Sequence, residues 1–284
     1  MKSKASNIKN IKAMTMVHND RFLPKWVEYY SSQLGKENLI VFFDGLDQVI
    51  PEECKGIECI RIPKMKGDVV ATDHQRSRFM SEQAAKLFNK GADMVIACDA
   101  DEFLIADPAL GMTLPEFLSS LPDYPSHSGL GVDVLQDLQT ERQMDFSMPF
   151  LSQRHIGWLH SRYTKPSVIT RPLTWGGGYH RVKNTNFHIA KGLYLFHFGA
   201  ADLESLKRIS EDPNRVNNGW TRHQNKRLRN LETISRLSLR DWDKTVDKVR
   251  RIQTFCRPMF APNKPTTFGL KFVAEIPGRF AKMV

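Results

Sequence analysis

The stretch that decides the fold is Met94-Val95-Ile96-Ala97-Cys98-Asp99-Ala100-Asp101-Glu102. Its first five residues are apolar and rich in β-branched side chains, and the turn Gly91-Ala92-Asp93 precedes them. A short apolar run bounded by turn signals predicts a strand buried on both faces, as in a parallel sheet. Three acids follow at the point where this strand leaves the sheet, which is the edge where open α/β sheets bind ligands.

The spacing of the acids predicts a metal site. Alternate residues of an extended segment point the same way, so Asp99 and Asp101 can place two carboxylates on one side. Hard oxygen ligands suit Mg²⁺ or Mn²⁺, and a diphosphate can supply further oxygens. The alternative is a polar loop with solvated acids, which is the usual meaning of so short a motif. The metal site is favoured because the acids directly follow a predicted core strand.

The first half of the chain alternates strand and helix patterns. A helix is predicted from the apolar spacing between Leu23 and Leu34, with Asp20 as its cap, Pro24 in its first turn and Gly35 as its stop. A second helix is predicted to open with a capping box at residues 72–75 and to run through Phe88. Strands are predicted at residues 11–17, 39–43, 57–62 and 94–98. Strands separated by helices predict an α/β fold with a mostly parallel sheet and crossover helices.

The pattern is looser after Glu102. It indicates a short helix at residues 115–121, a strand at 128–135 and a late strand at 192–196 that runs into His197. Residues 146–186 are rich in Trp, His, Arg and Gly, which is typical of ligand-contacting loops. From residue 202 onward helices dominate, with an apolar stripe that includes Leu231, Trp242 and Val249. The tail after Pro258 is expected to be irregular and to pack over the body.

Composition narrows the class of protein. The chain has 284 residues, of which 41% are hydrophobic, and its amino terminus lacks the apolar core of a signal peptide, so a cytoplasmic location is expected. Its four cysteines, Cys54 and Cys98 among them, are expected to be free thiols. Residues 204–257 hold fourteen Lys/Arg against seven Asp/Glu, which is +7 of the net charge of +10. Such a segment attracts phosphates or anionic membranes; with no nucleic-acid motif present, nucleic acid is not an expected partner.

Six segments carry a likeness to a known family: Val17-His18-Asn19-Asp20, Trp26-Val27-Glu28-Tyr29-Tyr30, Leu34-Gly35, Asp44-Gly45, Cys98-Asp99-Ala100-Asp101-Glu102-Phe103 and Tyr194-Leu195-Phe196-His197-Phe198-Gly199, with weaker likeness at Lys165-Pro166 and 175–180. Through these segments, residues 11–200 resemble the family 2-like glycosyltransferases of the GT-A fold. The resemblance implies a nucleotide-sugar-binding catalytic domain over residues 1–200, with a basic helical extension, residues 201–284, packed on it. It implies transfer of a sugar from a nucleoside diphosphate to a glycan or glycolipid acceptor, with Mn²⁺ or Mg²⁺ held by Asp99 and Asp101. Peripheral contact with an anionic membrane is a further expectation.

Further residues are expected around the acids. His197 follows an apolar strand and is the candidate third metal ligand, since a neutral imidazole binds Mn²⁺ well beside carboxylates. Arg76 and Arg78, on the helix before the acidic strand, cannot both face the diphosphate, because residues two apart on a helix point about 200° apart. Arg76, one turn into the helix, is favoured for this contact. The loops after the first two strands are expected to surround the base and ribose of the donor through His18, Asn19, Asp20 and Asp44.

The acceptor side is less defined. An inverting transferase needs a base near the acceptor hydroxyl, for which the sequence offers His180 and Asp133, whereas a retaining mechanism needs none. Both mechanisms stay open. Trp175 and Tyr179 are candidates for stacking on an acceptor sugar, although aromatic side chains are more often part of a core.

Two other functions fit parts of the sequence. A sugar nucleotidyltransferase shares the metal chemistry but normally has a glycine-rich phosphate loop after its first strand, where this chain has residues 18–22, His-Asn-Asp-Arg-Phe. A non-catalytic module that binds a glycan or a nucleotide on a degenerate transferase fold is the other alternative. A module that only binds has no evident need for two carboxylates, Asp99 and Asp101, at the end of a strand.

Overall fold

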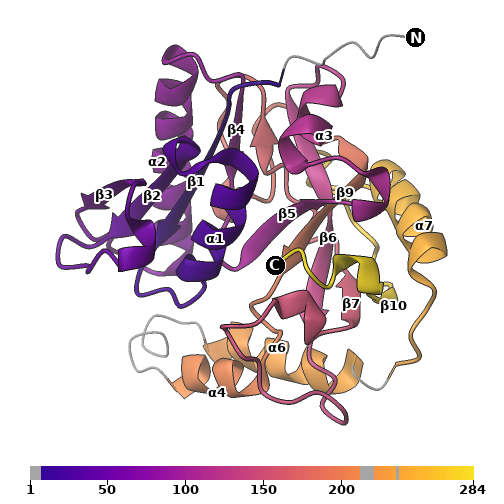
Figure 1. The fold of residues 1–284 in the computed structure, drawn as a ribbon. Helices are drawn as coiled ribbons and strands as arrows, with labels where there is room; N and C mark the ends of the chain where they lie inside the picture. The colour runs from indigo at the N-terminus through magenta and orange to yellow at the C-terminus, as the bar shows by residue number, and fades with distance from the viewer. Residues whose placement is uncertain (1–7, 212–220, 235–236) are drawn as a thin grey trace.

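The computed structural model describes residues 8–211, 221–234 and 237–284. Its amino-terminal half is a parallel sheet with helices on both faces (Figure 1). The strands lie in the order β4-β1-β2-β3 and all run parallel, which confirms the predicted α/β class. The elements of this half are β1 (Ile11–Val17), α1 (Leu23–Leu34), β2 (Leu39–Asp44), β3 (Glu58–Ile62), α2 (Val69–Asn89) and β4 (Met94–Ala97).

The two faces of this sheet are covered by different helices because strand side chains alternate in direction. Ala13 of β1 belongs to the hydrophobic cluster that contains Trp26 of α1. Its neighbour Met14 belongs to the cluster that contains Met80 of α2. Both faces are therefore buried, which explains the unbroken apolar runs of β1, β2 and β4.

The helix ends differ in part from the prediction. Pro24 lies in the first turn of α1, and Gly35 ends it with a φ of 84°. Asp20, however, is not the cap: its Oδ1 accepts from the N–H of Phe22, which is the capping residue. The cap of the second helix is Asp68 rather than Thr72: the carboxylate of Asp68 accepts from the N–H of Ala71, so the helix begins at Val69, one turn earlier than predicted.

Beyond β4 the sheet continues with antiparallel neighbours in the order β10-β7-β6-β8-β4. A strand at Glu102 that the prediction lacked, β5, pairs antiparallel with β9, which runs parallel beside β6. Two further strands, β7 and β8, lie in the segment that was predicted to be loops. They are only four and two residues long, so their pattern carries little signal. The elements are β5 (Glu102–Ala106), β6 (Ser126–Leu135), β7 (Ile156–Leu159), β8 (Val168–Ile169), β9 (Ile189–His197) and β10 (Val273–Glu275).

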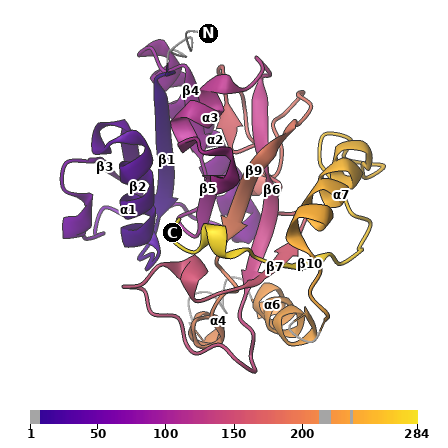
Figure 2. The ribbon, with the colours of Figure 1, turned by 45° about the vertical axis from the view of Figure 1, so that its right-hand side comes forward.

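The later helices surround this mixed part of the sheet (Figure 2). They are α3 (Leu114–Ser120), α4 (Leu203–Glu211), α6 (Thr221–Ile234) and α7 (Trp242–Phe255). The predicted apolar stripe of Leu231, Trp242 and Val249 is buried, and Trp242 stacks on Phe196 of β9 at 6.0 Å. The tail is not wholly irregular, because β10 pairs with β7. Short 3₁₀ helices are Lys36–Asn38, Glu52–Cys54, Pro108–Leu110, Phe150–Ser152, Gly177–Tyr179 and Gly278–Phe280.

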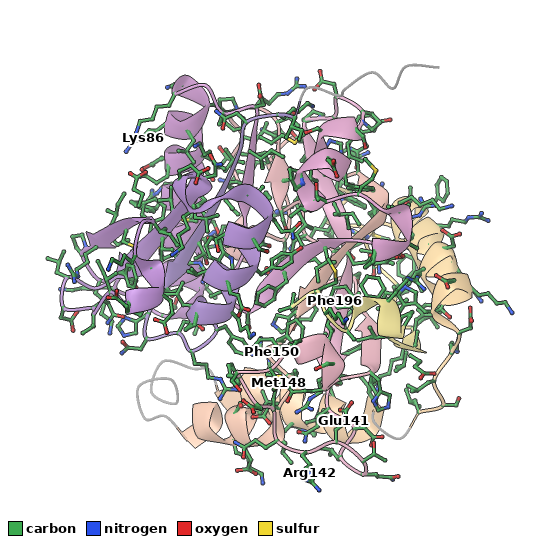
Figure 3. The ribbon with its side chains drawn as sticks, viewed as in Figure 1. Lys86, Glu141, Arg142, Met148, Phe150 and Phe196 are labelled. Carbon is green, nitrogen blue, oxygen red and sulfur yellow. The ribbon has the colours of Figure 1, made fainter. Side chains whose placement is uncertain are left out.

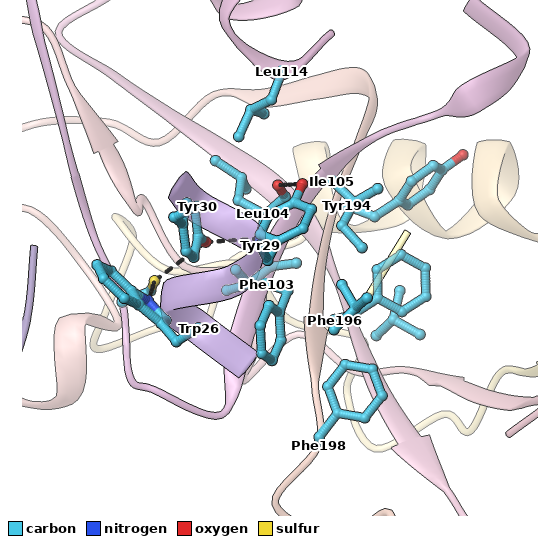
Figure 4. Close-up of a cluster of buried hydrophobic side chains, with 14 of the residues drawn as sticks. Trp26, Tyr29, Tyr30, Phe103, Leu104, Ile105, Leu114, Tyr194, Phe196 and Phe198 are labelled. Atoms are coloured by element: carbon cyan, nitrogen blue, oxygen red, sulfur yellow. Dashed lines mark hydrogen bonds between the residues drawn. The ribbon is translucent and has the colours of Figure 1, made fainter. Parts of the chain in front are cut away.

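An aromatic core fixes the end of β4 and the start of β5 (Figure 4). Trp26 donates its Nε1–H to Cys98 Sγ over 3.5 Å, and the Tyr30 hydroxyl lies 3.4 Å from the same sulfur. Burial raises the pKa of the Cys98 thiol to about 12. The ring of Phe103 packs on Phe150, which is labelled in Figure 3. All four cysteines are free thiols, as predicted, and no helix within the described residues is long and apolar enough to cross a membrane.

Candidate functional site

The carboxyl ends of β1, β2 and β4 meet at one edge of the sheet because these strands are parallel neighbours. Thr15 of β1 donates its hydroxyl to the carbonyl of Cys98 over 2.9 Å, which ties the two strands together just before the acids. His18, Asp44 and Asp99 therefore follow adjacent strands. This is the arrangement that the sequence predicts, and it is the usual ligand-binding edge of an α/β sheet.

Asp99 faces two cations. One carboxylate oxygen contacts the Arg76 guanidinium, and the other accepts from Lys165 Nζ over 3.0 Å. Lys165 Nζ also lies 2.6 Å from Oε1 of Glu102, which is fully buried. The lysine thus bridges two carboxylates across the turn that leads from β4 to β5. Asp99 is a quarter exposed and lies at the outer end of this bridge.

Asp101 faces a histidine instead. Its Oδ2 lies 3.3 Å from Nε2 of His197 at the end of β9, and the N–H of Phe198 donates to its carbonyl over 2.9 Å. The other ring nitrogen, Nδ1, lies 2.6 Å from Oδ1 of Asp133 on β6. Burial alone would lower the pKa of His197, but Tyr163 and these two carboxylates raise it well above its usual value. Asp101, Asp133 and His197 therefore form one row of charges across β6, β9 and the start of β5.

Tyr163 and Arg227 complete this row. The Tyr163 ring stacks on His197, with 3.9 Å between ring centroids. Burial alone would lower the pKa of Arg227, on α6, but Tyr163, Asp101 and Asp133 raise it. These interactions place a helix of the carboxyl-terminal region at the candidate site.

The residues around Asp101 and His197 fit a divalent cation in part. A β-carbon built on Gly199 would lie 2.7 Å from Asp101 Oδ2 and 2.7 Å from His197 Nε2, so the glycine leaves open space next to both atoms. The carboxylate of Asp133, which contacts Nδ1 of His197, is in the position of the groups that usually orient a metal-binding imidazole. Within the described residues no group of three His, Cys, Asp or Glu side chains is spaced to hold an ion. Asp99 is engaged with Arg76 and Lys165 instead.

The loops expected to bind the donor base lie together. His18 donates its Nδ1–H to the carbonyl of Asp44 over 2.6 Å, and its Nε2 lies 3.4 Å from Lys64 Nζ. The Asp44 carboxylate accepts from the N–H of Met65 over 2.7 Å. Asn19 has a positive φ of 47°, and its N–H donates to a side chain, that of Gln48. Asp20 serves the turn before α1, as described above.

Arg76 and Arg78 point to different places, as their spacing predicts. Arg76 contacts Asp99 and donates its Nε–H to the Tyr179 hydroxyl over 3.2 Å. Arg78 lines an open groove of about 590 Å³ between α2 and residues 172–175. Only Arg76 belongs to the candidate site.

The structure does not support the two candidates for a general base. His180 donates its Nδ1–H to the carbonyl of Arg162 over 3.0 Å, and burial together with Lys165 and Lys264 lowers its pKa to about 3. A base so weak is poorly matched to neutral pH. Asp133 is buried behind His197 and holds that ring, so it does not face a substrate. The sequence does not show that β6 lies beside β9, and this pairing is what places Asp133 next to His197.

The two aromatic candidates for acceptor stacking are buried. Trp175 is 1% exposed and donates its Nε1–H to the carbonyl of Pro166 over 2.9 Å. Tyr179 is 0% exposed, with its hydroxyl on Arg76 and Lys165 Nζ 5.9 Å from its ring. Neither ring presents a face to a sugar, so both are part of the wall beside the site.

Sequence reasoning missed several residues of the site, among them Tyr163, Arg227 and Gly199. Lys165 lies in a segment of weak family likeness, and the sequence predicts no role for it. No local pattern marks these residues, because each reaches the site from a different element. The pairing of β5 with β9 and of β9 with β6 is what brings them together.

No model of a known protein family matches this chain, and no curated protein sequence matches it. Among solved structures it is similar to a mannose-1-phosphate geranyltransferase from Thermus thermophilus, with a TM-score of 0.28 and 11% identity over 81% of this chain and 65% of that one. It is also similar to a glycosyltransferase involved in the glycosylation of the major capsid of PBCV-1, with a TM-score of 0.22 and 14% identity over 46% of this chain and 54% of that one. The chain therefore spans less than two thirds of either protein, and similarity at this level carries no information on activity.

Proposed function

We propose that this protein is a glycosyltransferase that moves a sugar from a nucleoside diphosphate to a carbohydrate or glycolipid acceptor. One observation carries the proposal: Asp101 Oδ2 and His197 Nε2 lie 3.3 Å apart at the carboxyl edge of parallel strands, with Asp133 behind the histidine. A paired carboxylate and imidazole at this edge suit a divalent ion whose other ligands are substrate phosphates. The resemblance noted in the sequence indicates the same chemistry.

Mn²⁺ or Mg²⁺ would be held by Asp101 and His197, and it would stabilise the negative charge that develops on the leaving diphosphate. Arg76 and Lys165 supply two further cations beside Asp99. Their role in the proposal is to bind the diphosphate and to hold Asp99 in place next to the donor ribose. His18 and Asp44 define the end of the site that would receive the base.

Peripheral contact with an anionic membrane is part of the proposal, and its support lies in α7 and the segment that follows it. Phe255, Met259 and Phe260 are 81%, 86% and 93% exposed. Exposed aromatic side chains among cations are typical of proteins that lie on a lipid surface. Between residues 248 and 274 the sequence has no acid and six cations, Lys248, Arg250, Arg251, Arg257, Lys264 and Lys271.

The test is thermal unfolding of the full chain with a panel of nucleoside diphosphates, in Mn²⁺, in Mg²⁺ and in EDTA. A ligand at about 100 times its Kd should stabilise the native state by roughly 2.7 kcal/mol. We expect a metal-dependent shift that is lost in Asp101→Asn and His197→Gln and kept in Asp123→Asn, a matched change on the surface. Release of pyrophosphate from a nucleoside triphosphate and a sugar phosphate would favour a nucleotidyltransferase. The absence of any metal-dependent shift would contradict the transferase site and favour a binding module.

A further inference from the structure

A second polar cavity lies next to the candidate site. It has a volume of about 240 Å³ and lies between the first turns of α2, the turn at Gly177 and the carboxyl-terminal tail. No role was predicted for it. Its lining residues are Val70, Asp73, His74, Gly177, Arg181 and Lys264.

The cavity has an excess of positive charge. Arg181 and Lys264 line it, and Arg162 lies near enough for its charge to lower the pKa of Lys264, an effect to which burial and Arg181 also contribute. Within the described part of the chain none of these three cations forms an ion pair. Asp73 is the single acid that lines the cavity. Arg181 and Lys264 against Asp73 give the lining a net charge of about +1, and Arg162 adds a further positive charge nearby, so the cavity favours an anion.

The backbone of the cavity is held in place by a tight hairpin and by the tail. Trp175 and Val182 form an isolated bridge, and the N–H of Gly176 donates to the carbonyl of Arg181 over 2.9 Å. Gly178 has a φ of 62°, and a β-carbon there would lie 3.0 Å from the His180 ring. The hairpin thus directs Arg181 to the cavity and brings Gly177 to its wall.

The tail contributes Lys264 through a defined contact. Asn263 donates its Nδ2–H to the carbonyl of Val182 over 2.9 Å, and the N–H of Lys264 donates to the carbonyl of Ala261 over 3.0 Å. Lys264 is half-buried as a result. A lysine placed against an arginine of the same sign is unfavourable unless an anion lies between them.

Two contacts connect this cavity to the acids. Asp99 contacts Arg76, and Arg76 donates to Tyr179, the residue that follows Gly177 and Gly178 in the turn. Gly177 in the wall of the cavity is thus two residues from Tyr179, which contacts the Arg76 that holds Asp99. The donor diphosphate has its own cations, Arg76 and Lys165, at the strand edge.

From this arrangement we infer that the cavity binds a phosphoryl group of the acceptor, held by Arg181 and Lys264. The acceptor is then a phosphorylated molecule, either a sugar phosphate or a lipid phosphate. The inference that this ligand is the acceptor rests on the proposed function; the phosphate site itself does not. Guanidinium and ammonium donors beside a small cavity are a common means of binding phosphate.

The test is calorimetric titration of the full chain with inorganic phosphate in EDTA, which removes metal-dependent binding at Asp101. We expect binding that weakens at least about tenfold in Lys264→Gln and in Arg181→Gln, because each variant loses one charge-assisted contact. The matched controls are Lys183→Gln and Arg171→Gln, two nearby cations outside the cavity, and they should bind phosphate like the wild type. A hexose 1-phosphate and a short prenyl phosphate, compared in the same titration, identify the source of the phosphoryl group; tighter binding of either one than of inorganic phosphate supports the inference.

Three results would overturn the phosphate site: no phosphate binding by the wild type at millimolar concentration, unchanged affinity in both cavity variants, or loss of binding in Asp101→Asn. The last result would mean that phosphate binds at the donor site. The metal-dependent shift with nucleoside diphosphates, measured on the same samples, reports separately on the proposed function. Phosphate binding without that shift would contradict the proposed transferase function but would still support the phosphate site.

Discussion

Asp133 and His197 are direct partners in the parallel pairing of β6 with β9, and Oδ1 of Asp133 lies 2.6 Å from Nδ1 of His197. Neighbouring strands therefore hold the imidazole in one orientation, with Nε2 directed to Asp101. The same contact helps to keep the ring protonated, because Asp101 and Asp133 both favour the charged form. A metal ion at Nε2 has to displace that proton.

The first prediction concerns pH. The folded-state pKa of His197 is raised, so its contribution to stability is complete below the unfolded value of about 6.5 and is lost as pH rises through the folded value. Metal binding has the opposite dependence, since it requires the unprotonated ring. We expect stabilisation by Mn²⁺ to increase with pH, measured by thermal unfolding from pH 6 to 9. His197→Gln should remove most of this increase; an unchanged pH profile in that variant would argue against the histidine as a ligand.

The second prediction is that Asp133→Asn weakens metal binding without unfolding the protein. The amide has nearly the same shape but lacks the charge that orients the imidazole and makes it more basic. Loss of such a partner typically costs 10- to 100-fold in affinity. Mn²⁺ titration of the variant measures the effect, with Asp123→Asn as the control. Wild-type affinity in Asp133→Asn would mean that the contact only stabilises the fold.

A third prediction follows from the open space at Gly199. The β-carbon of Gly199→Ala would lie 2.7 Å from both Asp101 Oδ2 and His197 Nε2, atoms that would have to move. We expect the metal-dependent shift with nucleoside diphosphate to be lost, and the melting temperature in EDTA to change much less. Gly278→Ala, where a β-carbon would meet no atom within 4 Å, is the control. A fully retained shift in Gly199→Ala would place the ion elsewhere.

A fourth prediction concerns the buried bridge made by Lys165. Glu102 is 0% exposed and lies 2.6 Å from Lys165 Nζ, so Lys165→Met would leave its carboxylate without this partner in the core. Breaking one side of such a pair usually costs about 3–5 kcal/mol. Urea unfolding of Lys165→Met, Glu102→Gln and the double variant measures the coupling. We expect the double variant to be more stable than Lys165→Met; a double variant whose loss of stability equals the sum of the two single losses would show that the pair is not coupled.

A fifth prediction tests the exposed aromatic segment. Met259→Ser with Phe260→Ser removes two apolar side chains that are 86% and 93% exposed. Binding to vesicles that contain phosphatidylserine, measured by sedimentation, should fall several-fold with little change in melting temperature. Val49→Ser, at a residue that is 82% exposed elsewhere on the chain, should bind like the wild type. Failure of the wild type to bind anionic vesicles at any salt concentration would rule out the membrane contact.

The parallel half of the sheet was predictable because its signals are local. The apolar run before Asp99 is buried on both faces, and Gly35 ends α1 as expected. The placement of His18 and Asp44 at one edge follows from the parallel order of the strands alone. The start of α2 was misplaced by four residues, since Asp68 and Thr72 are both plausible caps and only the structure distinguishes them.

The mixed half of the sheet was not predictable in the same way. Phe103 of β5 pairs with Phe196 of β9, more than 90 residues later, and such a pairing leaves no periodic mark on either segment. For the same reason Lys165 and Arg227 could not be assigned to the site. Trp175 and Tyr179 are aromatic residues of the kind that stack on sugars, but the hairpin that contains them buries both rings, so neither can contact a sugar.

The sequence by itself determined the α/β class, the buried strand before the acids and the edge at which Asp99 and Asp101 lie, because hydrophobic periodicity and chain direction are local properties. Only the tertiary structure decided what each acid faces. Asp99 faces Arg76 and Lys165, whereas Asp101 faces His197. That division depends on side chains from α2, β9 and the loop after β7, which long-range strand pairing brings to one place.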